Sequence, residues 1–190
     1  MKPELFADLG LDLSPEFFER IAKFNDILLE WNKIHNLSGA TTEKEVTAQV
    51  YDSIYPLTFL EDFSDMLDIG SGAGFPAIPL ACARPDIPMT LVEPTKKRVA
   101  FLNYVVIKLG LKNVKIHDKR IEEMPPHTYS LITSKAVMSA DRLFALTKGM
   151  MDEKSVMLLY KGRNTEDETT TIPRLKIVDA EHSRYLVIQK

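Results

Sequence analysis

The sequence has a single cysteine, Cys82, and no apolar run approaching the about 20 residues that a membrane-spanning helix needs. One cysteine excludes an internal disulfide framework and a thiolate zinc site, and it fits a reducing compartment. The first residues lack the basic and then apolar pattern of a secretory signal. Internal repeats and low-complexity tracts are also missing. We therefore expect a soluble cytoplasmic protein, a monomer with no membrane partner and no metal.

The length and composition of the chain suit one domain or slightly more. Of 190 residues, 45% are hydrophobic and 27% are charged, an ordinary globular composition. The net charge of −3 hides an asymmetry, because residues 1–65 carry 5 basic and 13 acidic groups whereas residues 96–120 carry 8 basic groups and one acidic group. A basic block inside an acidic chain permits a polyanionic partner on one face, and a solvated helix face is the alternative.

The first 60 residues predict helices. Ser14 followed by Pro15 is typical of a helix start, with a hydroxyl cap and a proline in the first turn. Thr42 with Glu45 three residues later matches a capping box, which predicts a second helix from residue 41 or 42. The first helix has an apolar stripe at three- and four-residue spacing, which must pack against the rest of the chain. The stripe consists of Phe17, Ile21, Phe24, Leu28, Trp31 and Ile34.

From residue 66 short apolar runs alternate with helical segments, which predicts a parallel sheet covered on both faces. The expected strands are 66–69, 89–92, 113–117, 129–133, 155–160, 174–178 and 184–189, and the expected helices are 75–83, 95–109 and 138–149. Only a short polar link separates the last two strands, so they must pair antiparallel. This pair favours a methyltransferase sheet over an ordinary dehydrogenase sheet. We expect an N-terminal helical segment, 1–62, packed on a domain of residues 63–190.

A glycine-rich loop is the strongest local signal. Gly70, Gly72 and Gly74 lie between an expected strand and an expected helix, where side chains would block a tight turn and a close ligand. Glu93 ends the next strand, 19 residues after Gly74, where such folds place the carboxylate that accepts both ribose hydroxyls. The pattern predicts a nucleoside cofactor; a purely structural turn is the alternative.

The type of nucleoside follows from Asp68 and from the G-x-G-x-G spacing, which differs from the dinucleotide pattern G-x-G-x-x-G. A carboxylate at Asp68 would repel a pyrophosphate but suits the ammonium and sulfonium groups of S-adenosylmethionine (SAM). SAM is therefore favoured over NAD. A compatible alternative is that Asp68 caps the amides of the glycine turn. Pro79 falls late enough in the helix expected over 75–83 to strain it.

Further motifs extend over most of the chain. They are Trp31-Asn32-Lys33 with Asn36-Leu37-Ser38, Asp52-Ser53, Asp68 through Leu80, Lys97-Arg98 with Phe101-Leu102, Arg120-x-Glu122-Glu123, Ser134-Lys135-Ala136, Lys161-Gly162 and Arg184 through Ile188. On these motifs the chain resembles the small-subunit ribosomal RNA guanine-N7 methyltransferases called RsmG or GidB. The resemblance implies an α/β fold: the class I SAM-dependent (Rossmann-like) sheet, mostly parallel, with an antiparallel C-terminal strand pair.

The resemblance also implies an activity and a site. The activity is methyl transfer from SAM to N7 of a guanine in the decoding-region loop of 16S ribosomal RNA, with the RNA or the small ribosomal subunit as partner. The implied SAM contacts are Gly70 and Phe75, with Ile121 and Glu122 on the adenine side and a cationic contact at Lys135. Lys135 stands where the family usually has arginine, which loses the planar guanidinium fork.

Two further departures from the family pattern concern Gln49, where histidine is usual, and residues 162–173, which are polar and lack a helical period. Because N7 of guanine carries a lone pair and no proton, we nominate no catalytic base. Arg120, Lys135 and Lys161 are candidates for contacts to phosphate or to guanine O6, with plain salt bridges as the alternative.

Two other functions fit the same pattern. One is a SAM methyltransferase that acts on a small molecule, with the helices of residues 1–62 as a lid. The other is a nucleoside-sensing or RNA-chaperoning module without turnover. Cytosine-C5 chemistry is disfavoured because Cys82 falls within a helix, where we expect it to be buried. The four histidines are expected to be structural or surface residues.

Overall fold

The computed structural model describes residues 2–135, 137–162, 172, 174–180 and 183–190. Its strands are β1 (Met66–Ile69), β2 (Met89–Val92), β3 (Val114–His117), β4 (Leu131–Lys135), β5 (Val156–Gly162), β6 (Leu175–Asp179) and β7 (Ser183–Gln189). The helices are α1 (Pro15–His35), α2 (Glu43–Ile54), α3 (Ala77–Ala83), α4 (Lys96–Leu109) and α5 (Ala140–Thr147), with 3-10 turns η1 (Pro3–Leu9), η2 (Tyr55–Thr58), η3 (Ile121–Glu123) and η4 (Lys148–Met150).

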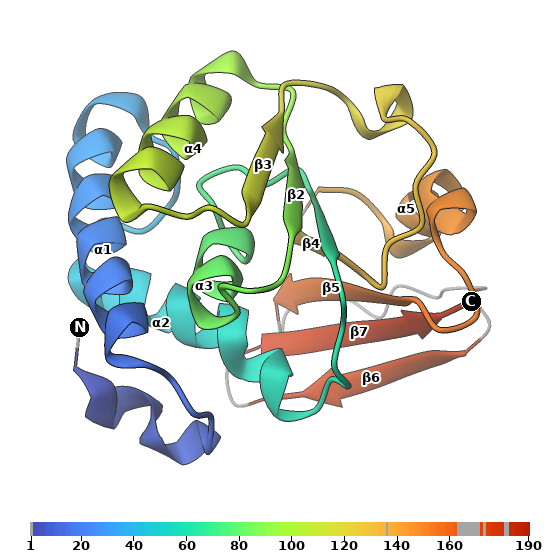
Figure 1. Cartoon of the computed structure of the whole chain (residues 1–190), viewed down its shortest axis with the longest axis horizontal. Helices are drawn as coiled ribbons and strands as arrows, with labels where there is room; N and C mark the ends of the chain where they lie inside the picture. Colours follow the sequence, from blue (N-terminus) through green and yellow to red (C-terminus); the bar gives the residue numbers. More distant parts are fainter. Residues whose placement is uncertain (1, 136, 163–171, 173, 181–182) are drawn as a thin grey trace.

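The strands form one seven-stranded sheet in the order β3-β2-β1-β4-β5-β7-β6 (Figure 1). Strands β1 to β5 run parallel, and β7 lies between β5 and β6, antiparallel to both. The prediction of a parallel sheet with an antiparallel C-terminal pair is confirmed. Strands 66–69 and 89–92 were predicted with their observed bounds, and the other sheet strands and helices differ at their ends by one or two residues.

The helix starts follow the predicted caps. Ser14 Oγ accepts the Phe17 amide at 3.2 Å, and Thr42 with Glu45 forms the capping box of α2. The prediction of a strained helix at Pro79 is wrong, because α3 begins only at Ala77. Pro79 therefore lies in the first turn, where an amide has no partner within the helix and a proline is tolerated.

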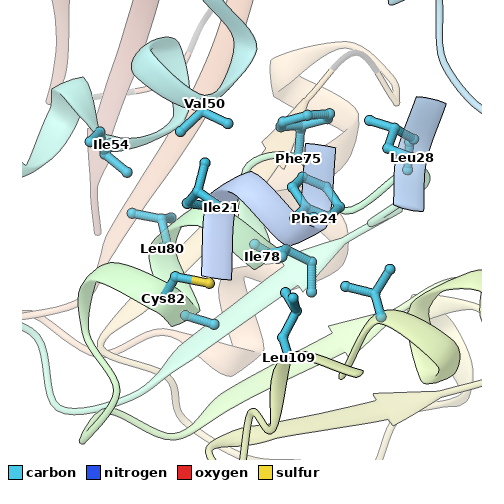
Figure 2. Close-up of a cluster of buried hydrophobic side chains, with 14 of the residues drawn as sticks. Ile21, Phe24, Leu28, Val50, Ile54, Phe75, Ile78, Leu80, Cys82 and Leu109 are labelled. Atoms are coloured by element: carbon cyan, nitrogen blue, oxygen red, sulfur yellow. The ribbon is translucent and has the colours of Figure 1, made fainter. Parts of the chain in front are cut away.

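Buried side chains form one core on each face of the sheet. The first contains residues of α1 to α4, which gather on the left of Figure 1, and the second contains residues of α5, on the right. Phe24 of α1 packs edge-on against Phe75 at 5.3 Å between ring centroids, close to Ile78 of α3 (Figure 2). The stripe of α1 thus packs on the sheet domain as predicted, except that Ile34 is 78% exposed.

Among the described residues, α5 is the one helix of eight or more residues that covers the second face of the sheet. The polar segment 162–173, from which we expected thin cover of one sheet face, lies outside the described residues apart from its two positions 162 and 172. No helix among the described residues is long and apolar enough to cross a membrane.

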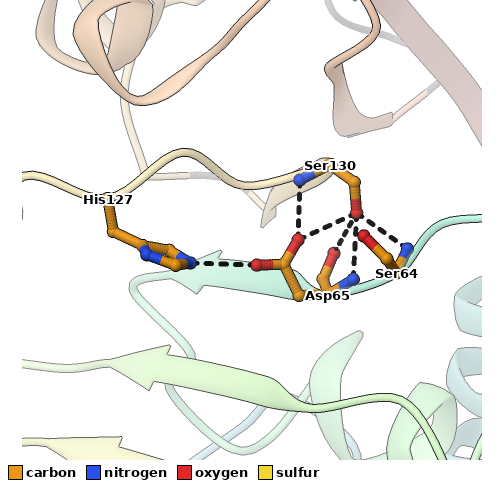
Figure 3. Close-up of polar contacts among 4 residues, drawn as sticks. All are labelled: Ser64, Asp65, His127 and Ser130. Atoms are coloured by element: carbon orange, nitrogen blue, oxygen red, sulfur yellow. Dashed lines mark hydrogen bonds and ion pairs between the residues drawn. The ribbon is translucent and has the colours of Figure 1, made fainter.

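A polar cluster joins the segments that enter β1 and β4 (Figure 3). Ser130 Oγ accepts the amides of Ser64 and Asp65 at 3.0 and 2.9 Å, and the Ser130 amide donates to Asp65 Oδ1 at 2.8 Å. His127 Nε2 lies 3.0 Å from Asp65 Oδ2. These contacts fix the register of neighbouring strands at their amino ends, which gives His127 a structural contact.

Asn32, in one of the family motifs, closes the turn after α1. Its amide nitrogen donates to the Ala40 carbonyl at 2.6 Å, and its oxygen accepts the amides of Leu37 and Ser38 at 2.7 and 3.0 Å. We expect Asn32→Ala to lower the free energy of unfolding by about 2–4 kcal/mol, because several backbone groups lose their partner. Urea unfolding measures this loss. Asn103→Ala removes a single bond, to the Val99 carbonyl, and should cost under about 0.5 kcal/mol; equal losses would contradict the role of Asn32.

Candidate functional site

The glycine loop lies where β1 ends, at the carboxyl edge of the parallel strands. Gly70, Gly72 and Gly74 have φ angles of 71°, 54° and 91°, which favour glycine. A Cβ at Gly70 would lie 2.5 Å from a methyl group of Val137, and one at Gly74 would lie 2.7 Å from Ile78 Cγ1. At Gly72 the nearest atom is the Gly70 carbonyl oxygen at 3.6 Å. Gly70 and Gly74 therefore serve packing, whereas in the described part of the chain a Cβ at Gly72 would meet only this one backbone oxygen, at ordinary van der Waals distance.

Glu93, just beyond β2, holds this loop in place. Its Oε2 accepts the Gly72 amide at 2.9 Å and its Oε1 accepts the Thr95 amide at 2.9 Å. The carboxylate is buried, with Arg98 Nη1 3.8 Å from Oε2. Each carboxylate oxygen has a second lone pair, so these bonds leave acceptor capacity for the ribose hydroxyls that we expect at Glu93.

Asp68 of β1 is a buried carboxylate whose hydrogen bonding is incomplete. It is 1% exposed; Oδ1 accepts the Thr133 hydroxyl at 2.7 Å, and Oδ2 has no hydrogen-bond partner. Burial raises the pKa of this carboxyl to about 7, against the opposing effect of its hydrogen bonds. The alternative that Asp68 caps the glycine-turn amides is wrong, because its neighbour in register is Thr133 of β4 and Glu93 takes the Gly72 amide instead.

Lys135, the last residue of β4, lies on the same face of the sheet. Its Nζ is 5.9 Å from the centroid of the Phe75 ring and 6.0 Å from that of Tyr160. Nζ also donates to Asp52 Oδ2 of α2 at 2.8 Å. The structure thus brings Phe75 and Lys135 together as neighbours. Sequence reasoning missed the partner Asp52, and its one signal was the motif Asp52-Ser53.

The remaining predicted residues are more dispersed. Arg120 and Glu122 flank the buried Ile121 at η3 and are exposed, beyond the carboxyl end of β3. Arg120 forms no ion pair within the described part of the chain. Lys161 follows Tyr160 in β5, so strand alternation turns it to the face opposite Lys135. Gln49 lies one turn before Asp52 in α2.

Two other chemistries can be judged from the described residues. Cys82 is buried in α3, and burial raises the pKa of its thiol to about 12, so it is not a thiolate nucleophile. Among the residues that the structure describes, no three His, Cys, Asp or Glu side chains are grouped as a metal site requires.

Comparison with known proteins decides the family. The sequence profile of GidB, rRNA small subunit methyltransferase G, matches residues 18–189. The chain belongs to this family. The ribosomal RNA small subunit methyltransferase G of Wolinella succinogenes is 44% identical over 174 residues, which cover 92% of this chain and 90% of the relative.

Solved structures agree on the fold. A putative caffeoyl-CoA O-methyltransferase from Staphylococcus aureus is similar with a TM-score of 0.62 at 12% identity, covering 87% of this chain and 92% of that chain. A SAM-dependent methyltransferase from Aquifex aeolicus has a TM-score of 0.53 at 16% identity, covering 66% and 81%. At these identities the likeness concerns the fold alone. The predicted class I SAM-dependent methyltransferase fold is confirmed.

The family identifies the chain as a methyltransferase with SAM as its cofactor. The residues of the glycine loop fit this group. Asp68 Oδ2 is a buried acceptor without a partner, and an ammonium is a suitable donor for it. Among the described residues, no side chain lies within 4 Å of a Cβ built at Gly72, so a nucleoside can approach the backbone there. The alternatives of a small-molecule methyltransferase and of a module without turnover are not favoured.

Proposed function

We propose that this protein transfers the methyl group of SAM to N7 of a guanine in the decoding-region loop of 16S ribosomal RNA. The observation that carries the proposal is the family match over residues 18–189. The partner is the RNA itself or the small ribosomal subunit, and the protein acts in the cytoplasm as a monomer. We also propose that residues 1–62 form a helical segment packed on the methyltransferase domain of residues 63–190.

The site residues have separate tasks in this proposal. SAM carries its methyl group on a sulfonium. The lone pair of N7 forms a new bond to the methyl carbon, and the electrons of the broken carbon–sulfur bond remain on sulfur. No proton is transferred, so the protein has to position the reactants. Asp68 binds the ammonium of the cofactor, Glu93 accepts its ribose hydroxyls, and Ile121 with Glu122 contacts the adenine side. The loop contributes Gly70, Gly72, Gly74 and Phe75.

The charge distribution supports an RNA substrate. Three of the basic residues of segment 96–120 begin α4 and two follow β3, so five lie toward the carboxyl edge of the sheet, as the glycine loop does. They are Lys96, Lys97, Arg98, Lys119 and Arg120, and all five are exposed. Phosphates beside a target guanine must approach this edge. Lys161 remains a proposed phosphate contact, with its side chain on the face of the sheet opposite Lys135.

We expect Lys119→Ala with Arg120→Ala to weaken RNA binding about tenfold or more and to reduce the salt dependence by about two counterions, because each side chain releases about one counterion from a phosphate. The measurement is filter binding at several salt concentrations. Lys112→Ala with Lys115→Ala is the matched control, since these exposed lysines lie before and within β3, toward its amino end. Equal losses in both double variants would mean that the effect is general electrostatics.

Methylation of RNA tests the function directly. Ribosomal RNA and small subunits from cells that lack the gene are incubated with the protein and with SAM labelled in its methyl group. We expect the label at one guanine of 16S RNA, as N7-methylguanine, on mapping the modified nucleotide. Label in a small metabolite with unlabelled RNA would favour the small-molecule enzyme, and SAM binding without any transfer would favour the sensing module.

A further inference from the structure

Asp52 joins three elements that are far apart in the sequence. Its Oδ2 accepts the Lys135 ammonium at 2.8 Å, and its Oδ1 accepts the hydroxyl of Tyr185 of β7 at 2.8 Å. The Tyr185 hydroxyl also lies 3.1 Å from the Asp52 carbonyl oxygen. The next residue, Ser53, accepts the hydroxyl of Tyr160 through its carbonyl at 2.8 Å. Both carboxylate oxygens of Asp52 are thus held by neighbours from the sheet.

The two tyrosines beside Asp52 are buried and remain hydrogen-bond donors. Tyr185 and Tyr160 are buried and contact each other edge-on at 5.4 Å between ring centroids. Burial, with the nearby carboxylate of Asp52, raises the pKa of both phenols above its usual value, so both keep their protons at neutral pH. Lys135 keeps only part of its side chain exposed, 27%, and lies beside Phe75 of the cofactor loop. An anchored carboxylate therefore fixes an ammonium at the edge of the site.

We infer that Asp52 is a positioning residue for methyl transfer, which acts through Lys135. This inference rests on the proposed function. Asp52 takes up one donor of the ammonium and directs the other two toward the site, where they can reach an acceptor such as guanine O6. The same contact also balances charge. When N7 gains the methyl group, positive charge passes from sulfur to the purine, and an unpaired ammonium beside it would oppose this change. Paired with Asp52, Lys135 donates hydrogen bonds with little net charge.

Asp52→Asn tests the inference, because the amide oxygen keeps an acceptor for Tyr185 while the charge is lost. We expect kcat for RNA methylation to fall about tenfold or more, with KM for RNA changed less, since misplaced groups near the reacting atoms are costly. The melting temperature should stay within about 3 °C of wild type. In Lys135→Gln, Asp52 has nothing to position, so adding Asp52→Asn to Lys135→Gln should cause no further loss. Losses that multiply in the double variant would refute action through Lys135.

Controls separate positioning from stability. Glu16→Gln changes an exposed carboxylate that pairs with Arg20 on α1, and it should leave kcat unchanged. Lys135→Arg, which restores the residue usual in the family, should retain activity with Asp52 present. If Asp52→Asn does not fold, Tyr185→Phe removes one anchor without changing charge and should lower kcat severalfold; an unchanged kcat overturns the inference.

The outcomes also distinguish this inference from the proposed function. If the wild-type protein forms no N7-methylguanine in 16S RNA, the proposed function itself has failed. If the wild-type protein is active and Asp52→Asn is equally active, or loses activity only in proportion to its loss of folded protein, only the positioning role is refuted.

Discussion

Gly72→Asp is expected to reduce the affinity for SAM more than a hundredfold while leaving the protein folded. Gly72 is the one glycine of the loop where a new side chain would meet no other side chain, the nearest atom being the Gly70 carbonyl oxygen at 3.6 Å. An aspartate side chain would therefore extend into the space beside the loop, where the nucleoside has to approach. It would also add a second carboxylate beside Glu93, whose Oε2 accepts the Gly72 amide. Calorimetric titration with SAM measures the loss.

The backbone at this position requires a matched control. The φ angle of Gly72 is 54°, a left-handed conformation that costs aspartate less than most residues. Gly110, which ends α4, has a φ angle of 64° and open space around it. Gly110→Asp should therefore show a similar small loss of stability with unchanged affinity for SAM. Retained affinity in Gly72→Asp, or an equal loss in Gly110→Asp, would refute the assignment of the loop.

The features that sequence predicted well depend on local chemistry. The caps at Ser14 and Thr42 need only residues within one turn, and the glycine loop needs a strand before it and a helix after it. Ile34 shows the limit of a periodic pattern. It continues the three-residue step from Trp31, but the last turns of α1 meet α4 through Trp31 and His35. Trp31 contacts Phe101, and the His35 carbonyl accepts the Lys97 ammonium, whereas Ile34 is exposed.

The contacts that sequence did not predict depend on the register of distant strands. Asp68 faces Thr133 because β1 and β4 pair in that register, 65 residues apart, and this leaves the glycine-turn amide to Glu93. The pairing of Asp52 with Lys135 joins residues that are 83 positions apart. It forms because α2 packs on the face of the sheet toward which the Lys135 side chain points. No local pattern encodes either arrangement. Asp68 and Lys135 were therefore identified from the sequence, but their partners Thr133 and Asp52 were not.

Asp68 should make the stability of the unliganded protein fall as the pH rises from about 4 to about 7. Its carboxyl has a folded pKa of about 7, raised by burial from 3.8. In this range the folded protein keeps the proton that the unfolded chain has lost, so stability is full below the unfolded pKa and is lost as the pH rises through the folded pKa. The slope is about 1.4 kcal/mol per pH unit and the whole loss is about 4 kcal/mol. Asp68→Asn should remove this dependence, as measured by urea unfolding at a series of pH values.

Asp152 is a control of opposite sign. The amide of Lys154, followed by contacts from Ser155, lowers the pKa of this carboxyl, so its contribution to stability is lost as the pH falls through the folded pKa. Asp152→Asn should therefore remove stability at neutral pH, whereas Asp68→Asn should add it. The same direction of change in both variants would mean that Asp68 does not carry a raised pKa.

The affinity for SAM should respond to pH in the opposite direction from stability. An ammonium pairs with the ionised form of Asp68, so binding below pH 7 must first remove the proton that burial retains. The affinity should rise about tenfold per pH unit up to about 7 and then level off, with close to one proton released on binding at pH 6. Titrations in buffers of different ionisation enthalpy measure this release. Asp68→Asn should bind SAM weakly at every pH and release no proton. Release of a proton by Asp68→Asn would assign the titration to another group, and strong binding by it would remove Asp68 from the cofactor site.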